Sequence, residues 1–134
     1  MTISEETLEF TPQYDANGLI PCITTSVKSG KVLMFAFMNA QAVKKTLETG
    51  EVHYWSRSRG ELWHKGASSG MVQKLVEMRT DCDQDVLWVS VDMEPEASCH
   101  TGRQSCFYRK VNKDGTLEMI DDAQIFDPDK VYSK

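Results

Sequence analysis

The longest uninterrupted apolar run in the sequence is Val32–Met38, which has seven residues. A helix that crosses a bilayer needs about 20 such residues, so the run is too short to span a membrane. Its length and continuous apolar character are typical of a buried strand. The chain has 134 residues with 40% hydrophobic content, which fits one domain that builds its own core.

The regions on either side of this run have alternating strand and turn signals. Leu19–Val27 is predicted to be a strand, and Asn39 and Gly50 are a helix N-cap and C-cap that bound a helix of about ten residues. Strands outnumber helices and no regular β-α-β alternation is present, so we expect an α+β fold with a mostly antiparallel sheet and few short helices. The remaining predictions are strands at 52–56, 72–80 and 86–93, a loop at 57–70, and a hairpin made by 106–111 and 116–120.

No repeat or linker divides residues 1–134, so we expect a single domain with an N-terminal arm at 1–13 and a C-terminal tail at 121–134. The formal charge of −5 argues against a broad surface for nucleic acid or an anionic membrane. The polar and acidic start is unlike a signal peptide, so we expect a cytoplasmic protein.

Four cysteines stand at positions 22, 82, 99 and 106. In a reducing compartment such a set indicates metal binding or catalysis, whereas in a secreted protein two disulfides would be the simpler interpretation. Cys82, Cys99 and Cys106 would give three thiolates, and three protein ligands plus a water are typical of a catalytic zinc. Cys22 could supply a fourth ligand, but its place in a predicted strand favours a small buried hydrophobe.

Asp81, Asp83 and Asp85 alternate along the segment Asp81-Cys-Asp-Gln-Asp85. If the segment is extended, the three carboxylates share one face, where their repulsion favours a bound cation. A calcium loop is excluded because its sixth and twelfth positions would be Val86 and Asp92. A solvated acidic turn remains the alternative.

The two donor sets favour different ions, since thiolates prefer zinc and carboxylates prefer magnesium or calcium. In an extended segment Cys82 would point away from the carboxylates, so one chain could not easily bring both ions to one pocket. A pocket between two subunits would remove that difficulty, and this predicts a homodimer.

His100 adjoins Cys99, between two predicted metal ligands. A lone histidine is often structural, but the titration of imidazole near neutral pH suits proton transfer at such a place. His53 and His64 lack such neighbours and are left as structural or substrate-lining.

All five arginines lie in the middle of the sequence, which suggests a local anion site, although a set of surface ion pairs is the alternative. The loop at 57–70 combines forked cations, hydroxyls and glycines, as phosphate binding requires. No nucleoside-triphosphatase loop motif is present. The predicted phosphate contacts are Arg57, Ser58, Arg59, Lys65, Ser69 and Arg103.

Taken in order, these blocks resemble the phosphoribosyl-AMP cyclohydrolase family, from about residue 15 to residue 111. The resemblance is carried by Asn17-Gly-Leu-Ile-Pro21, Val32-Leu-Met, Met38-Asn39, Thr49-Gly50, Tyr54-Trp-Ser-Arg-Ser-Arg59, Leu62-Trp63, Lys65-Gly66, Ser69-Gly70, Gln73, Asp81-Cys-Asp-Gln-Asp85, Cys99-His-Thr-Gly-Arg103 and Ser105-Cys-Phe-Tyr108.

The resemblance implies hydrolytic opening of the adenine ring of phosphoribosyl-AMP between N1 and C6, in histidine biosynthesis. It also implies a homodimer in which Cys82, Cys99 and Cys106 hold a zinc ion shared between subunits. Magnesium would bind Asp81, Asp83 and Asp85.

Two departures from the family pattern are visible. The connection at 92–98 is longer and more acidic than we expect, and only about two dozen residues follow Val111, so no fused pyrophosphatase domain is expected. A zinc-dependent deaminase is a rival, but its His-x-Glu and Pro-Cys-x-x-Cys signature is missing. A zinc-stabilised binding module is a second rival, and it would hold a closed site with four ligands.

Overall fold

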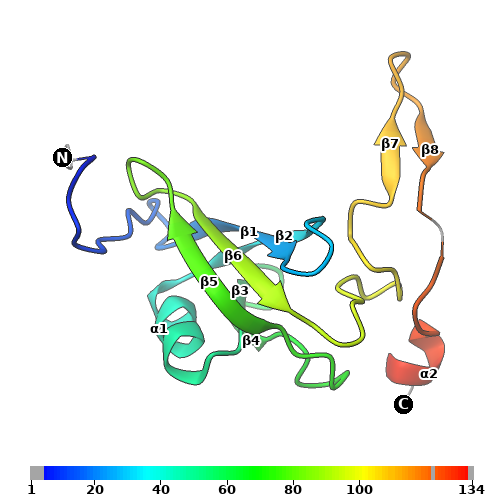
Figure 1. Cartoon of the computed structure of the whole chain (residues 1–134), viewed down its shortest axis with the longest axis horizontal. Coiled ribbons are helices and arrows are strands. Elements are labelled where there is room, and N and C mark those ends of the chain that lie inside the picture. Colours follow the sequence, from blue (N-terminus) through cyan, green and yellow to red (C-terminus); the bar gives the residue numbers. More distant parts are fainter. Residues whose placement is uncertain (1–4, 122, 133–134) are drawn as a thin grey trace.

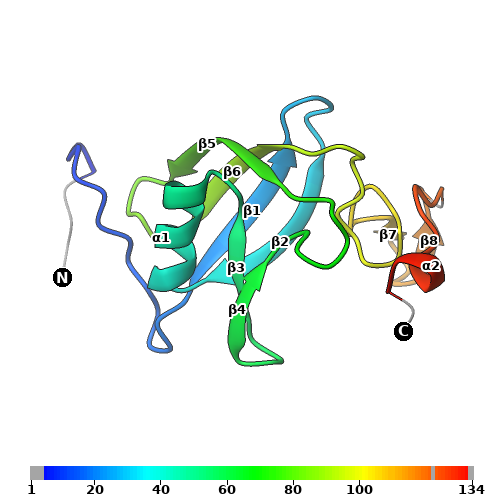
Figure 2. The same ribbon diagram turned by 90° about the horizontal axis from the view of Figure 1, so that it is seen from below.

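The computed structural model describes residues 5–121 and 123–132. Its main feature is a six-stranded sheet in the order β4-β3-β2-β1-β6-β5, with helix α1 packed on one side (Figures 1 and 2). Along the chain the elements are β1 (Ile20–Ser26), β2 (Val32–Met38), α1 (Ala40–Thr49), β3 (His53–Ser56), β4 (Glu61–His64), β5 (Lys74–Thr80), β6 (Leu87–Asp92), β7 (Arg109–Val111), β8 (Leu117–Met119) and α2 (Pro128–Tyr132).

Strand β1 lies near the middle of the sheet, antiparallel to β2 and parallel to β6. The other neighbouring pairs are antiparallel, as are β7 and β8 in a separate two-stranded sheet. The predicted α+β class with a mostly antiparallel sheet is therefore confirmed.

The sequence signals around α1 act as predicted. The Asn39 side chain accepts a hydrogen bond from the Ala42 N–H at 2.8 Å, which satisfies one N-terminal donor of the helix. Gly50 ends the helix with φ +73°, a left-handed conformation that glycine adopts without a steric penalty.

One face of the sheet carries the core. Alternate side chains of β1 and β6 point toward α1 and the adjoining loops, and they are almost completely buried. Cys22 belongs to this set, and burial raises the pKa of its thiol to about 12. The main cluster is Ile20, Cys22, Leu33, Met34, Met38, Ala42, Val43, Val52, Tyr54, Leu87, Val89 and Val91.

The opposite face of the sheet is apolar and open. Ile23 pairs with Phe35 on one side and with Trp88 on the other, and all three side chains are exposed. The Phe35 and Phe37 rings meet edge to face, with 5.4 Å between their centroids. A contiguous exposed apolar patch of this kind is typical of a protein interface.

One prediction about local structure is wrong, and one condition used in the sequence analysis is not met. Residues 57–70 are not one loop, because Glu61–His64 forms β4 and pairs with β3 in a hairpin. Residues 81–85 are not extended either. They form a turn in which Gln84 has φ +59°, so the argument that placed Cys82 opposite the carboxylates does not hold.

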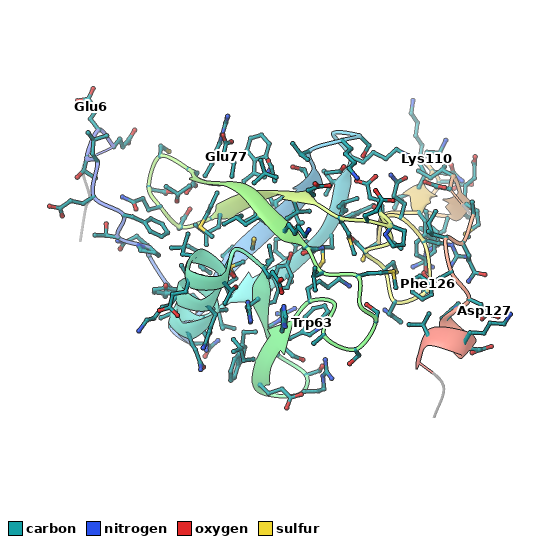
Figure 3. The ribbon with its side chains drawn as sticks, turned by 60° about the horizontal axis from the view of Figure 1, so that its bottom comes forward. Glu6, Trp63, Glu77, Lys110, Phe126 and Asp127 are labelled. Carbon is teal, nitrogen blue, oxygen red and sulfur yellow. The ribbon has the colours of Figure 1, made fainter. Side chains whose placement is uncertain are left out.

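The C-terminal part lies beside the sheet rather than on it (Figure 1). The predicted hairpin is present but shorter, as β7 and β8, and the tail forms α2, which was not predicted. Phe126, labelled in Figure 3, packs with Val131 against a small cluster of Met71, Met93 and Ala97. Within the described residues, no helix is both long and apolar enough to cross a membrane.

Candidate functional site

Two adjoining cavities lie beside the β3–β4 hairpin, with volumes of about 500 and 530 Å³. Arg59, Trp63 and His100 line both of them, so the two form one continuous candidate site. Figure 3 labels Trp63 on this hairpin. Cys106 lies in the wall of the first cavity, and Phe37 in the wall of the second.

The segment 98–106, here called the thiol loop, folds back on itself and brings Cys99 and Cys106 together. The Cys99 N–H donates to the Arg103 carbonyl at 3.1 Å, and the Cys106 N–H donates to the Leu33 carbonyl at 2.7 Å. Thr101 donates its hydroxyl to the Cys99 sulfur at 3.0 Å. Burial, together with the neighbouring Cys99, raises the pKa of the Cys106 thiol to about 12. A thiolate pair at this place therefore needs a compensating positive charge.

Cys82 is not part of this pair. It is exposed in the turn between β5 and β6, whereas the thiol loop lies beyond the opposite end of the six-stranded sheet (Figures 1 and 2). One chain therefore brings together two of the three predicted zinc ligands.

The same β5–β6 connection, residues 81–85, is here called the acidic turn. One oxygen each from Asp81, Asp83 and Asp85 lie within 4.8 Å of one another, the one such group of candidate metal ligands in the described parts of the chain. Interaction with the carboxyls of Asp83 and then Asp81 raises the pKa of Asp85 to about 6. The three carboxylates thus converge as predicted, through a turn rather than an extended face.

The N-terminal arm holds the acidic turn through Gln84, whose side chain is buried. Thr11 N–H donates to the Gln84 side-chain oxygen at 2.8 Å, and the Gln84 amide donates to the Glu9 carbonyl at 3.1 Å. Gln13 N–H donates to the Gln84 backbone carbonyl at 2.7 Å. Residues 9–13 are therefore anchored, and residues 1–4 of the predicted arm lie outside the described part.

Five of the six predicted phosphate contacts line a cavity, and one does not. Arg57 and Ser58 line the second cavity, Arg59 lines both, and Ser69 lines the first. Arg103 lines neither cavity, and its guanidinium lies 4.3 Å from the centre of the Tyr108 ring. Lys65 lines the first cavity, but its ammonium turns inward and donates to the Ser98 carbonyl at 2.5 Å.

His53 and His64 form a stacked pair, with 4.4 Å between ring centroids. Glu51 holds both rings, because its carbonyl contacts His53 Nδ1 at 2.8 Å and its carboxylate contacts His64 Nε2 at 2.7 Å. His64 lines the first cavity, which agrees with a structural or substrate-lining role.

A family model for phosphoribosyl-AMP cyclohydrolase matches residues 34–108, more than half of the chain. The chain belongs to the phosphoribosyl-AMP cyclohydrolase family. The protein of that name from Rhodopseudomonas palustris (strain BisA53) is 55% identical over 132 residues, covering 96% of this chain and 90% of that protein. Its namesake from Bradyrhizobium diazoefficiens (strain USDA 110) is 55% identical over 133 residues, covering 97% and 94%.

The phosphoribosyl-AMP cyclohydrolase family is the one that the sequence blocks predicted, so that prediction and the expectation of a hydrolase are confirmed. The family match begins in β2 and ends just after the thiol loop, and it therefore includes every residue that lines the two cavities.

Sequence reasoning missed the buried residues that support the cavity. Gln73 and Ser98 are almost fully buried and hydrogen-bonded to each other at 3.2 Å, although neither was given a role. A signal for β4 was available, because Leu62-Trp63-His64 lies between Gly60 and Gly66 and follows a strand after a short turn.

Proposed function

We propose that the chain hydrolyses 1-(5-phosphoribosyl)-AMP in histidine biosynthesis, opening the adenine ring between N1 and C6. The water oxygen ends on C6, and N1 keeps its phosphoribosyl group and gains a proton, which gives the formimino-carboxamide ribonucleotide. The observation that carries the proposal is that the family match spans the whole lining of the two cavities.

The cavity walls supply groups suited to this substrate. Arg57 and Arg59 lie at the second cavity, where guanidinium forks can bind phosphate in a bidentate manner, and the hydroxyls of Ser58 and Ser69 are further donors. Trp63 borders both cavities and offers an aromatic face for the purine. The two phosphates of the substrate and its base therefore have complementary groups along one continuous surface.

His100 is the proposed proton carrier. It is exposed and lines both cavities, next to Cys99 in the thiol loop. One ring nitrogen would take a proton from the attacking water and return it to N1 as the ring opens. Replacing His100 with alanine should lower kcat about 100-fold with metal content unchanged, and an unchanged kcat would remove His100 from the mechanism.

The donor set of the thiol loop fits a zinc ion held by Cys99 and Cys106, with Cys82 as the third ligand. Soft thiolates favour zinc, and a cation would stabilise a thiolate at Cys106, where burial raises the pKa of the thiol. When bound, zinc supplies a Lewis acid that lowers the pKa of a coordinated water. The turn that carries Cys82 and the thiol loop lie at opposite ends of the sheet (Figure 1). The Cys82 ligand would therefore come from a second copy of the chain.

The acidic turn fits a hard divalent cation. Three carboxylates within 4.8 Å repel one another, and oxygen ligands of this kind suit magnesium. We propose that Asp81, Asp83 and Asp85 hold that ion.

A homodimer would account for the open sheet face as well as for the divided thiols. Phe35, Ile23 and Trp88 form an exposed row across three strands, and burial against a second copy would remove it from water.

Mixed dimers of Cys82→Ala and Cys99→Ala chains test whether the zinc site is shared between subunits. Each mixed dimer would retain one intact site, so remixing two inactive variants should restore about a quarter of the wild-type activity. No recovery after proven subunit exchange would contradict a shared site.

The activity itself is tested by following ring opening of phosphoribosyl-AMP by ultraviolet absorbance. Turnover should be lost with a zinc chelator and return with added zinc, and it should also need magnesium. Release of ammonia without ring opening would instead identify a deaminase. A tightly bound zinc with no turnover would favour a binding module.

A further inference from the structure

A chain of buried polar side chains crosses the core and ends at the thiol loop. The Thr24 hydroxyl donates to the Tyr54 hydroxyl at 2.7 Å, and the Tyr54 hydroxyl donates to the Gln73 side-chain oxygen at 2.7 Å. The Gln73 amide then donates to the Ser98 hydroxyl at 3.2 Å. All four residues are 0–1% exposed. Burying so many polar groups is unfavourable unless each is bonded, so the arrangement fixes Ser98 in one position.

Lys65 holds the same residue from the cavity side. Its ammonium donates to the Ser98 carbonyl at 2.5 Å and lies 5.1 Å from the centre of the Trp63 ring, with the residue only 7% exposed. The Ser98 N–H donates to the Gln104 carbonyl at 3.0 Å. The N–H, the carbonyl and the hydroxyl of Ser98 are therefore all engaged, immediately before Cys99.

We propose that Lys65 and Gln73 are positioning residues, which clamp Ser98 from two sides and so fix Cys99 beside Cys106 for metal binding. This role replaces the phosphate contact that the sequence suggested for Lys65. It rests on the zinc site of the proposed function.

The charge of Lys65 suits the same role. Three thiolates around a divalent ion carry one net negative charge, and an ammonium close to Cys99 and Cys106 would offset it. A phosphate-binding lysine would instead extend its ammonium into the cavity.

The test uses full-length Lys65→Met and Gln73→Met, which remove the two contacts to Ser98 while keeping similar side-chain length. Tyr54→Phe is a milder third variant, since it removes only the hydroxyl that orients Gln73. Thr46→Val is the matched control, because Thr46 is also 0% exposed and accepts a hydrogen bond from the His53 N–H at 2.9 Å, away from Ser98.

Zinc affinity is measured by competition with a chromophoric chelator, and the thiolate-to-metal charge-transfer band is recorded with cobalt in place of zinc. Lys65→Met and Gln73→Met should each lower zinc affinity about 10- to 100-fold and weaken the cobalt band, as loss of an outer-shell partner does elsewhere. Tyr54→Phe should shift affinity in the same direction by less. Thr46→Val should leave both readouts at wild-type values even if it lowers Tm.

A raised KM of Lys65→Met for phosphoribosyl-AMP with unchanged zinc affinity would overturn the proposal and restore the phosphate contact. Wild-type zinc affinity in Gln73→Met would overturn it as well. If the wild-type protein itself shows no thiolate-to-cobalt band, the proposed zinc site fails. Equal bands in the wild type and in all variants would instead leave the zinc site standing and overturn the positioning role of Lys65 and Gln73.

Discussion

The thiol loop and the acidic turn lie at opposite ends of the sheet and are built in opposite ways. The acidic turn collects its three carboxylates from five consecutive residues, and the three aspartates are exposed. The thiol loop brings together two cysteines seven positions apart, beside a network of buried side chains from β1, β3 and the segment before β5. A local cluster can be recognised in sequence, whereas a site supported by the core depends on residues that no motif connects.

The largest expected effect is the loss of zinc affinity when a cysteine of the thiol loop is replaced, in contrast to replacement of the cysteine in the core. Cys99→Ser should lower zinc affinity by more than about 100-fold, because loss of a ligand exceeds the 10- to 100-fold cost of losing an outer-shell partner. Turnover should disappear with it. Cys22→Ser is the control: it replaces a buried, 0% exposed thiol and should lower stability but keep zinc. Metal content by elemental analysis of both purified variants checks this, and equal zinc in both would end the distinction between the two thiols.

Removal of a carboxylate from the acidic turn should change the response to magnesium rather than the zinc content. Asp83→Asn should raise the magnesium concentration that gives half-maximal activity by at least about tenfold, since a ligand is worth no less than an outer-shell partner. Zinc content should stay near the wild-type value, because the substitution changes none of the three cysteines proposed to hold zinc. Asp114→Asn, in the exposed connection between β7 and β8, is the control and should alter neither. A zinc loss in Asp83→Asn would show that the carboxylates of the acidic turn also position Cys82 for zinc.

Replacing Gln84, which anchors the acidic turn, should have a smaller effect, and the alanine and glycine variants should differ in stability in a defined order. Gln84→Ala removes two side-chain hydrogen bonds at a buried residue with φ +59°, and it should cost about 1–3 kcal/mol of stability. Gln84→Gly removes the same bonds but adopts the left-handed conformation more readily, so it should unfold at a higher denaturant concentration than the alanine variant. The reverse order in urea titrations would show that the left-handed conformation of residue 84 does not cost the alanine variant stability.

The same contrast explains what the sequence could and could not predict. The central strands and α1 follow from local signals, such as the apolar run at 32–38 and the caps Asn39 and Gly50. The missed strand β4 depends on pairing with β3, which outweighs its polar flanks. The sequence left residues 81–85 open between an extended segment and a turn, because the arm that supports Gln84 comes from 73 to 75 residues earlier in the sequence.

Within the candidate site, the residue types are visible in the sequence, but the directions of their side chains are not. The cysteines and arginines are chemically distinctive, so their types alone indicated a metal and a phosphate site. Lys65 has the same chemistry as a phosphate contact, yet its ammonium points inward to Ser98. Only the packing of the thiol loop against β4 decides this direction, and no local pattern encodes it.

The smallest effect concerns pH and again sets the acidic turn apart. The folded-state pKa of Asp85 is raised to about 6, from an ordinary value of 3.8, so the folded protein binds this proton more tightly than the unfolded chain does. Without divalent metal, the resulting contribution to stability is present below about pH 4 and is lost as pH rises through about 6. Asp85→Asn should therefore raise Tm relative to wild type at pH 7 and not at pH 4, in buffers with chelator.

Replacing Asp114 should change Tm at pH 7 in the opposite direction to replacing Asp85. Hydrogen bonds from the Thr116 hydroxyl and N–H lower the pKa of Asp114, so its contribution is present at neutral pH and is lost as pH falls through that lowered pKa. Asp114→Asn should thus lower Tm at pH 7, where Asp85→Asn raises it. Because both carboxylates are exposed, a common surface effect would move both variants in the same direction. Opposite shifts at pH 7 would trace the gain in Asp85→Asn to crowding of carboxylates in the acidic turn, which is the repulsion that a bound magnesium ion would relieve.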